Sequence, residues 1–259
     1  MSKARLRSSK NISTEKLADL SDFAGNRIIS AAREQIFQLS CLLDGNEEKY
    51  AKVKENSNEI IRLQSEFCDY CNIIANRNEV KLKRLHLKSA LLDIKQNIAA
   101  YAERKNVGID ISLKSPEDIV TVDAMKLYYS IFHILRNSME NSYDGSKIRI
   151  SVSNTNKYSK IKISDIGKGM DIETLEHCSE PFFSKNGGLG LGITIAKSNI
   201  EAMGGSFDIK SEEGKGTSVT MSILRANDPN EENAAEVKDM FDDRESIDEM
   251  VRTIFSSLI

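Results

Sequence analysis

Three short stretches carry the side chains that could do chemistry. The first, residues 165–170 (DIGKGM), directly follows an alternating, strand-like segment. Glycines at alternate positions let the backbone come close to a ligand, and a buried Asp165 carboxylate could accept a hydrogen bond from an exocyclic amine such as that of adenine. Acid-plus-glycine turns are common, so this stretch predicts a ligand pocket only together with other motifs.

The second and third stretches suit the phosphates of such a ligand. Residues 187–192 (GGLGLG) open a helix, where a glycine-rich loop presents backbone N–H groups to phosphates or is merely a flexible turn. Residues 133–141 (HILRNSMEN) place His133 and Asn137 on one helix face. The Asn137 amide oxygen suits Mg²⁺ and otherwise would be an ordinary solvated group. The order and spacing of the three stretches argue against coincidence.

The elements that position these residues alternate between helix and strand. Asp123 is a suitable N-cap for a helix over 123–141, and apolar–polar alternation predicts the strands. The expected strands are 109–113, 119–122, 147–153, 160–164, 206–210 and 217–224, with a helix ending near Met203 before the last pair, which forms a hairpin. Interleaved helices and antiparallel strands indicate an α+β fold, with an α/β sandwich over residues 105–225.

The first hundred residues have a different pattern. After a basic N-terminus, expected to be disordered over 1–11, apolar residues recur at helical spacing and a turn falls at 44–46. This pattern predicts a helical hairpin over 12–78, and two copies would bury their apolar faces as the four-helix bundle of a homodimer. Residues 79–104 are expected to form a charged linker and a joining helix.

Composition excludes several classes of protein. The 259 residues include 36 Lys and Arg, 39 Asp and Glu, and a formal net charge of −3, which argues against a nucleic-acid binder. No apolar run approaches a membrane span and no signal-type core follows the N-terminus, so we expect a cytoplasmic protein. The tail 226–259 holds ten acids and three bases, a net charge of −7, which leaves +4 on residues 1–225. Its apolar stripe predicts a helix that docks on its own domain or binds a partner.

Cys68 and Cys71 form a CxxC pair within the predicted hairpin, among four cysteines in all. The pair could mark a metal or redox site. A zinc site needs four ligands, and Cys41 would lie far down the hairpin, so we expect these cysteines to be small buried hydrophobic side chains.

Taken together, residues 119–225 resemble the GHKL (Bergerat) ATP-binding domain shared by sensor histidine kinases, type II topoisomerases, Hsp90 chaperones and MutL repair proteins. The matching motifs are the N box at 133–141, the G1 box at 165–170, the F box at 180–183 (EPFF), the G2 box at 188–192 and a closing glycine motif at 214–217 (GKGT). The F box points to histidine kinases. The segment 12–104 lies where such kinases keep their dimerisation and phosphoacceptor domain.

The resemblance implies ATP and Mg as cofactors and assigns roles to single residues. Asn137 would hold Mg²⁺, Asp165 would read adenine, and Thr217 would support Asp165. The implied ATP-binding residues are Asn137, Asp165, Gly167, Gly169, Phe182, Lys185, Gly188, Leu189, Gly190 and Thr217. His133 stands where relatives place Asn, His or Glu, so it is a candidate base, a phosphate contact, or a polar residue that only lines the pocket.

Several positions depart from the family pattern. Glu140 stands three residues after Asn137, where many relatives carry a base, and Ser179 replaces the apolar residue before the F-box Glu-Pro. The segment 184–187 between the F and G2 boxes is short, so the lid has less reach over the γ-phosphate.

The largest departure concerns the phosphoacceptor. Kinases of this family phosphorylate a histidine on the first bundle helix, but the histidines of this chain are His86, His133 and His177. Two alignments of the first helix put Arg27 or Arg33 at the acceptor position. A guanidinium stays protonated and cannot act as a nucleophile, so we expect no phosphoacceptor there.

The sequence therefore supports two hypotheses about function. The first is an ATP-binding pseudo-histidine kinase or ATP-regulated adaptor in a two-component-type pathway, read by a response regulator, a partner kinase or a protein that binds the tail. The alternative is an active protein kinase of the same superfamily that phosphorylates Ser, Thr or an atypical His on a partner, with His133 as base.

Overall fold

The computed structural model describes residues 47–113, 118–185, 188–226 and 244–255, with side chains from Val53 onward. The predicted N-terminus over 1–11, the first predicted helix, and Arg27, Arg33 and Cys41 lie outside the described residues. The elements are α2 (Glu47–Ile74), β1 (Lys83–His86), α3 (Leu87–Arg104), β2 (Gly108–Leu113), β3 (Ile119–Val122), α4 (Ala124–Asn141), β4 (Lys147–Asn154), β5 (Tyr158–Ser164), α5 (Ile172–His177), α6 (Gly192–Ala202), β6 (Ser206–Glu212), β7 (Gly216–Leu224) and α7 (Arg244–Phe255).

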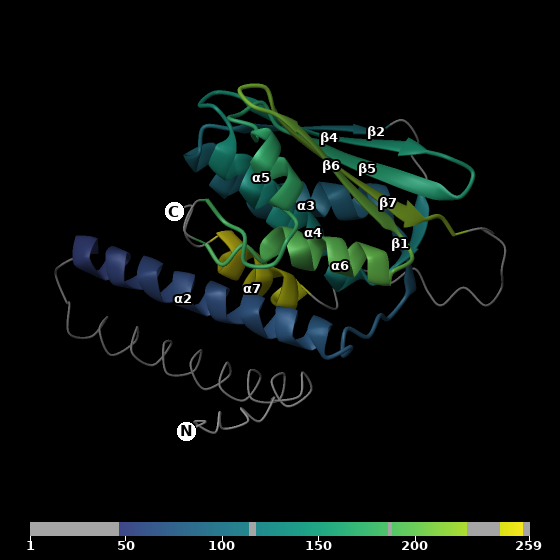
Figure 1. Ribbon diagram of the computed structural model, residues 1–259, viewed down its shortest axis with the longest axis horizontal. Helices are drawn as coiled ribbons and strands as arrows, with labels where there is room; N and C mark the ends of the chain where they lie inside the picture. Colours follow the sequence, from purple (N-terminus) through teal and green to yellow (C-terminus); the bar gives the residue numbers. More distant parts are fainter. Residues whose placement is uncertain (1–46, 114–117, 186–187, 227–243, 256–259) are drawn as a thin grey trace, which may run out of the picture.

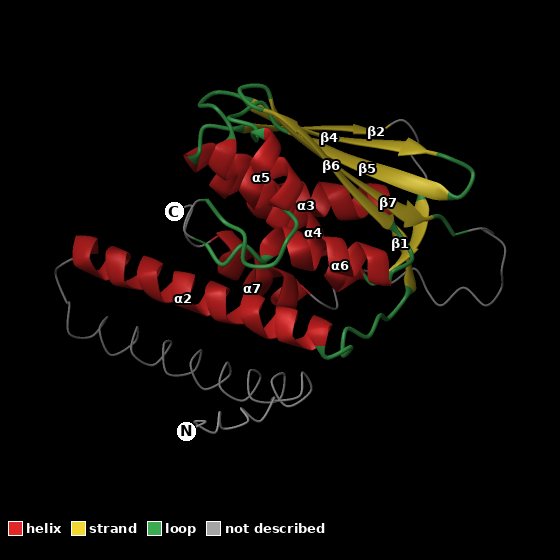
Figure 2. Ribbon diagram, viewed as in Figure 1, coloured by secondary structure: helices red, strands yellow, loops and turns green. Residues whose placement is uncertain are grey.

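A five-stranded mixed sheet forms one layer of the molecule and helices form the next (Figures 1 and 2). The strand order is β2-β4-β5-β7-β6, in which β2 pairs with β4 in parallel and the other neighbours are antiparallel. Helices α3, α4 and α6 pack on one face of this sheet. The predicted α+β sandwich is confirmed.

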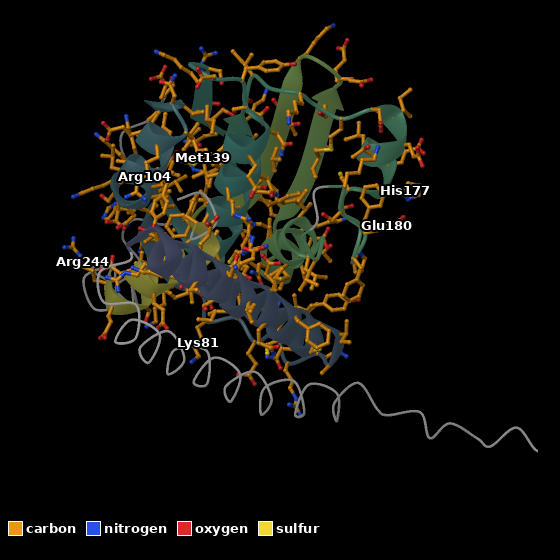
Figure 3. The ribbon with its side chains drawn as sticks, turned by 90° about the vertical axis from the view of Figure 1, so that its left-hand side faces the viewer. Lys81, Arg104, Met139, His177, Glu180 and Arg244 are labelled. Carbon is orange, nitrogen blue, oxygen red and sulfur yellow. The ribbon has the colours of Figure 1, made fainter. Side chains whose placement is uncertain are left out.

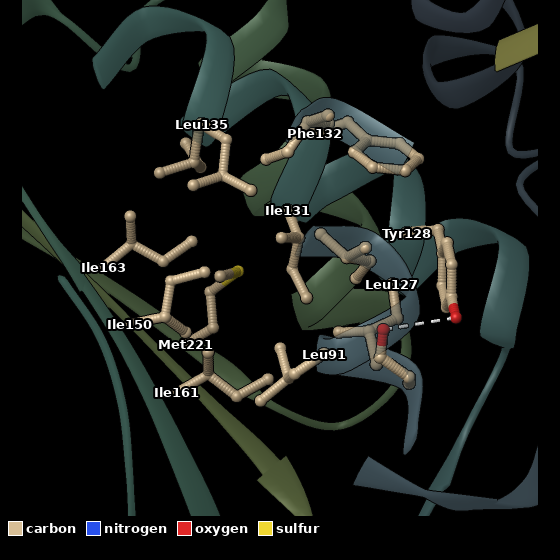
Figure 4. Close-up of a cluster of buried hydrophobic side chains, with 14 of the residues drawn as sticks. Leu91, Leu127, Tyr128, Ile131, Phe132, Leu135, Ile150, Ile161, Ile163 and Met221 are labelled. Carbon is tan, nitrogen blue, oxygen red and sulfur yellow. Dashed lines mark hydrogen bonds between the residues drawn. The ribbon is translucent and has the colours of Figure 1, made fainter. Parts of the chain in front are cut away.

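The core lies between the sheet and helices α3 and α4 (Figure 4). Side chains alternate between the two faces of β4 and β5, so Ile150, Ile161 and Ile163 point toward the helices. Ile131 and Leu135 of α4 pack against them. All five residues are at most 1% exposed in the described structure, and all but Ile163 are fully buried. This packed interface fixes α4, the helix that carries the candidate N box.

Helix α4 begins as the sequence predicts. The Asp123 side chain accepts a hydrogen bond from the Lys126 backbone N–H at 3.2 Å, which is the geometry of an N-cap. The strands also fall within a few residues of their predicted positions, and β6 and β7 pair as a hairpin. Helix α5, capped by Asp171, was not predicted because one and a half turns give little periodicity.

Residues 83–104, part of the predicted linker and joining helix, pack against the sandwich. Strand β1 pairs with β3 in an antiparallel ladder, and Leu85 is 3% exposed. Helix α3 buries Leu91, Ile94 and Ile98 completely. Strand β1 is hard to predict from the sequence because three of its four residues are Lys, Arg and His, and successive side chains of a strand point to opposite faces, so that only Leu85 is buried.

Helices α2 and α7 form a further layer beneath α4 and α6 (Figure 1). In α7, Ile247, Val251, Ile254 and Phe255 are buried, and the Phe255 ring lies 5.3 Å from that of Tyr101 and 5.9 Å from that of Phe132. The helical part of the acidic tail therefore docks on its own chain, the first of the two predicted alternatives. No helix in the described ranges has the length and apolarity needed to cross a membrane.

Candidate functional site

A pocket of about 440 Å³ opens beside α4 and brings the predicted motifs together. Its walls come from α4, the segment 165–171, the loop that leads into α6, strand β7, and three residues of α2, namely Glu59, Arg62 and Glu66. A volume of this order suits a nucleotide-sized ligand. Nine of the sequence-predicted residues line it: His133, Asn137, Asp165, Gly169, Lys185, Gly188, Leu189, Gly190 and Thr217.

Asp165 closes one end of the pocket. The residue is 8% exposed, and Oδ1 of its carboxylate accepts a hydrogen bond from the Thr217 backbone N–H at 3.0 Å. Burial raises the pKa of Asp165, while the Thr217 N–H and the Ser138 hydroxyl oppose that shift by donating to the carboxylate. A fixed, partly desolvated acceptor of this kind is suited to an exocyclic amine.

Ser211 joins the segments around Asp165 and was not predicted. Its hydroxyl accepts a hydrogen bond from the Met170 N–H at 2.9 Å, donates to the Gly216 carbonyl at 3.0 Å, and lies 2.8 Å from Thr217 Oγ1. Ser211 is the cross-strand partner of Thr217 in the β6–β7 hairpin. Counting back across the predicted turn from Thr217 would have located it.

Gly167 and Gly169 let the segment 165–170 pack closely against two other segments of backbone. A Cβ at Gly167 would meet the Asn141 carbonyl oxygen at 2.1 Å, and one at Gly169 would meet that of Glu212 at 2.0 Å. Gly169 also has a φ of +62°, which favours glycine. Gly167 does not line the pocket. The two glycines therefore shape the site by close packing on α4 and on the β6–β7 turn, whereas the sequence suggested close approach to a ligand.

The lid is attached at two points. Gly190, with φ +67°, packs so closely that a Cβ would lie 2.3 Å from the Phe183 carbonyl oxygen. Lys185 Nζ lies 2.9 Å from Asp171 Oδ2 as an exposed ion pair. Hydrogen bonds from Thr174 and then this ion pair lower the pKa of Asp171. Lys185 and Gly190, on either side of residues 186–187, thus contact the start of α5 and the F box.

Phe182, a predicted ATP-binding residue, does not line the pocket. Its ring is 55% exposed and meets the ring of Tyr70 in α2 edge to face, with 5.3 Å between centroids. It does not line the pocket, whereas Phe183 does. A positive φ of +65° at Phe182 turns its ring away from the pocket side, which the sequence pattern cannot reveal.

His133 and Asn137 line the other end of the pocket. His133 is 2% exposed, and burial together with the nearby charges of Arg136 and Arg62 lowers its pKa to about 3, so the imidazole is neutral at pH 7. Its Nε2 has no hydrogen-bond partner within the described part of the chain. Asn137 is half-buried.

An amide oxygen at Asn137 fits Mg²⁺ shared with phosphate oxygens and water. Across the ranges that the structure describes, no three His, Cys, Asp or Glu side chains are grouped to hold a metal ion. The pair Cys68 and Cys71 belongs to no such group, and Cys71 is fully buried in α2.

Charged residues that the sequence did not flag complete this end. Arg62 is 3% exposed, and its Nη1 lies 2.5 Å from Oε1 of Glu66, which is 2% exposed. Arg62 also pairs with Glu59, through Nε at 2.8 Å. On α4, Arg136 pairs with Glu140 at 2.6 Å, so the acid that departs from the family pattern neutralises a buried base. Nothing in the sequence links Arg62 to His133, 71 positions later.

The other two histidines lie outside the pocket. His86 is exposed at the end of β1. His177 lies at an edge of the molecule, where its Nδ1 is 3.0 Å from Glu180 Oε1, and this carboxylate raises its pKa (Figure 3).

Comparison with known proteins agrees with this geometry. Residues 122–227 match the family described as histidine kinase-, DNA gyrase B- and HSP90-like ATPase. Sporulation kinase D of Bacillus subtilis is 37% identical over 94 residues, covering 36% of this chain and 19% of that protein. Sporulation kinase B of the same organism is 28% identical over 167 residues, covering 64% and 39%. The sensor protein DivL of Caulobacter vibrioides is 21% identical over 180 residues, covering 69% and 23%.

Solved structures show the same fold. Full-length ShkA in complex with AMPPNP superposes with a TM-score of 0.70 at 18% identity, over 83% of this chain and 46% of that one. The histidine kinase ThkA in complex with the response regulator protein TrrA gives 0.60 at 15% identity, over 83% and 63%.

Fold and site thus define an ATP-binding domain of the GHKL class. Within that class, the domain matched over residues 122–227 is of the type found in sensor histidine kinases. It spans 19% to 39% of the length of the three curated relatives named above.

Proposed function

We propose that this chain is an ATP-binding, histidine-kinase-like signalling protein that acts as a pseudo-histidine kinase or ATP-regulated adaptor, without autophosphorylation on histidine. The observation that carries this proposal is the position of its three histidines. None lies between residues 12 and 78, and His133 is buried and neutral. His86 is exposed and His177 is half-buried, and neither lines the pocket.

ATP would lie with its adenine at Asp165 and its phosphates toward Asn137 and the lid. The buried carboxylate fixed by Thr217 supports the adenine assignment. Mg²⁺, when bound, would neutralise phosphate charge, and Asn137 supplies an oxygen of the type it prefers. Gly188, Leu189, Gly190 and Lys185 line the pocket on the lid side, where backbone N–H groups and an ammonium suit phosphates.

The alternative, a kinase that phosphorylates Ser or Thr on a partner, depends on His133 as general base. His133 does line the pocket. A pKa of about 3 makes the imidazole a poor proton acceptor at neutral pH, since catalytic bases work best when their pKa is near the ambient pH. Acid-stable phosphate on a partner, lost in His133→Ala, would favour this alternative.

We further propose a cytoplasmic homodimer formed through residues 12–78, with a response regulator or a kinase as partner. The ThkA–TrrA complex, which shares the fold, gives one precedent for such a pairing. Because α7 is docked, a partner of the acidic tail would bind residues of 226–259 around that helix or displace it.

The test is incubation of the full chain with Mg²⁺ and γ-radiolabelled ATP, followed by acid treatment. We expect bound nucleotide and no acid-labile phosphate on the chain. An Asp165→Ala variant controls for binding at the pocket. Detection of phosphohistidine on this chain would overturn the proposal.

A further inference from the structure

Helix α2 contributes a buried arginine to the nucleotide pocket. Arg62 lies in the pocket wall with Glu59 and Glu66, although α2 precedes the ATP-binding domain in the chain. Its guanidinium is next to the lid, since a Cβ built on Gly188 would lie 3.8 Å from Arg62 Nη2. Arg62 therefore reaches the side of the pocket where the lid glycines stand.

Carboxylates of the same helix hold this guanidinium. Glu66 Oε1 lies 2.5 Å from Arg62 Nη1, and Glu59 binds Nε at 2.8 Å and also Nη2. Arg62 and Glu66 are buried, and the transfer of charged groups out of water costs free energy unless the charges are closely paired. Glu59 and Glu66 thus occupy the bidentate positions on Arg62 that a phosphate could take, because a guanidinium binds carboxylate and phosphate with the same geometry.

The surroundings of Glu66 suit an anion in general. Glu66 Oε1 lies 3.8 Å from His133 Nδ1, and the positive charges of Arg62 and Arg136 both act to lower the pKa of Glu66 against the effect of its burial. The first residue of α6 packs on the same imidazole, since a Cβ on Gly192 would lie 2.7 Å from His133 Nδ1. Helix N-termini attract anions, and the 11 residues of α6 make a full helix.

The His133 imidazole in this corner is not fully hydrogen-bonded. His133 Nε2 is buried in the pocket wall and makes no hydrogen bond with any described residue. Buried polar atoms without a partner are uncommon in folded proteins and point to a missing ligand or water. Together with the two arginines and the helix terminus, this atom marks a built but incomplete anion site.

We infer that Arg62 binds the terminal phosphates of the nucleotide, and that Glu59 and Glu66 hold its guanidinium when those phosphates are absent. This inference rests on ATP binding in the proposed function. Phosphate entry exchanges one anion for another on the same cation. The exchange connects nucleotide state to α2, which also contacts the F box through Tyr70 and Phe182.

Opposite charge changes on α2 give opposite results in a binding experiment. The affinities of the full chain for Mg·ATP and for AMP are measured by calorimetric titration in wild type, Arg62→Gln and Glu66→Gln. Arg62→Gln should weaken ATP binding about tenfold and leave AMP binding unchanged, because AMP lacks the terminal phosphates. Glu66→Gln should strengthen ATP binding severalfold, because a competing carboxylate is gone.

The controls separate this inference from general damage and from the proposed function. Arg149→Gln removes an arginine on the exposed face of β4, outside the pocket, and should leave both affinities as they are. Equal weakening of ATP and AMP in Arg62→Gln, or an unchanged ATP affinity in a folded Arg62→Gln, would overturn the inference. If Arg62→Gln does not fold, the Glu66→Gln variant tests the inference instead. Unchanged or weaker ATP binding by Glu66→Gln would then overturn the inference. A wild-type chain that binds no ATP would refute the proposed function itself.

Discussion

The two ends of the pocket are built on different physical principles. At the Asp165 end, hydrogen bonds connect segments of one domain: the Thr217 N–H donates to the carboxylate, and Ser211 on the neighbouring strand contacts the Thr217 hydroxyl. At the His133 end, charges from two separate helices are buried together, with Arg62 and Glu66 from α2 against Arg136 from α4. A hydrogen-bonded end can stay rigid while a charged end exchanges its partners, so we expect binding specificity at the first and switching at the second.

Loss of the Asp165 carboxylate should have the largest effect on binding. Asp165→Ala should weaken ATP binding by about 100-fold, since the adenine amine loses a charged acceptor and the Thr217 N–H stays buried without one. Calorimetric titration measures the change. Asp208→Ala, on the exposed side of β6, is the matched control and should bind as wild type does. An unchanged affinity in Asp165→Ala would mean that the rigid end is not the adenine site.

A glycine comparison tests whether the Asp165 end is rigid through close packing. Gly169 and Gly145 both have positive φ, +62° and +70°, but only Gly169 has a carbonyl where a Cβ would stand. Gly145→Ala should lower the free energy of unfolding by about 1 kcal/mol from strain alone. Gly169→Ala should lower it by about 3 kcal/mol, because a backbone must also move. Urea denaturation of both variants gives the two values, and equal losses would refute close packing there.

Acid titration probes the charged end through His133. Its pKa is about 3 in the folded protein against 6.5 for an unperturbed imidazole, so unfolding takes up a proton between these values. The free energy of unfolding should therefore fall as pH falls from 6.5 toward 3, by up to about 1.4 kcal/mol per pH unit. Glu66, whose pKa burial raises, acts in the opposite direction, and Arg62 and Arg136 stay charged.

The contribution of His133 appears as a difference between variants. Urea denaturation at several pH values should give a flatter pH dependence for His133→Gln than for wild type. His86→Gln, at an exposed site outside the pocket, should keep the wild-type slope. Parallel curves for wild type and His133→Gln would show that the imidazole is not held neutral by this charged surrounding.

Phe182→Ala should have the smallest effect on ATP affinity, within about twofold, because the ring turns to Tyr70 and not into the pocket. Phe183→Ala, one residue on, should weaken binding more, since Phe183 lines the pocket. Titration of both variants ranks them. A larger loss in Phe182→Ala would place the F-box phenylalanine at the nucleotide after all.

The same contrast explains what the sequence could predict. Asp165, Thr217 and the glycines stand in short local motifs, and the strands around them alternate with period two, so sequence patterns predict both. Asp123 is a cap whose partner is three residues away. These features depend on residues close together in the chain or on adjacent strands.

The charged end could not be predicted because its partners are distant. Arg62 and Glu66 look like solvent-facing residues of an amphipathic helix, and they are buried because α2 packs on the ATP-binding domain next to Gly188 and His133. Strand β1 is similarly hidden, since its one ladder partner, β3, lies beyond α3. Phe182 depends on a positive φ, which its residue type does not indicate. In each case tertiary contacts overrode the local pattern.

The most direct test of the account is the choice between nucleotides at the Asp165 end. The full chain is titrated with Mg·ATP and with Mg·GTP under the same conditions. Because Asp165 can accept a hydrogen bond from the amine of adenine but not from the carbonyl that guanine places there, ATP should bind at least about tenfold more tightly. Equal affinities for ATP and GTP, or no binding of ATP, would contradict the account.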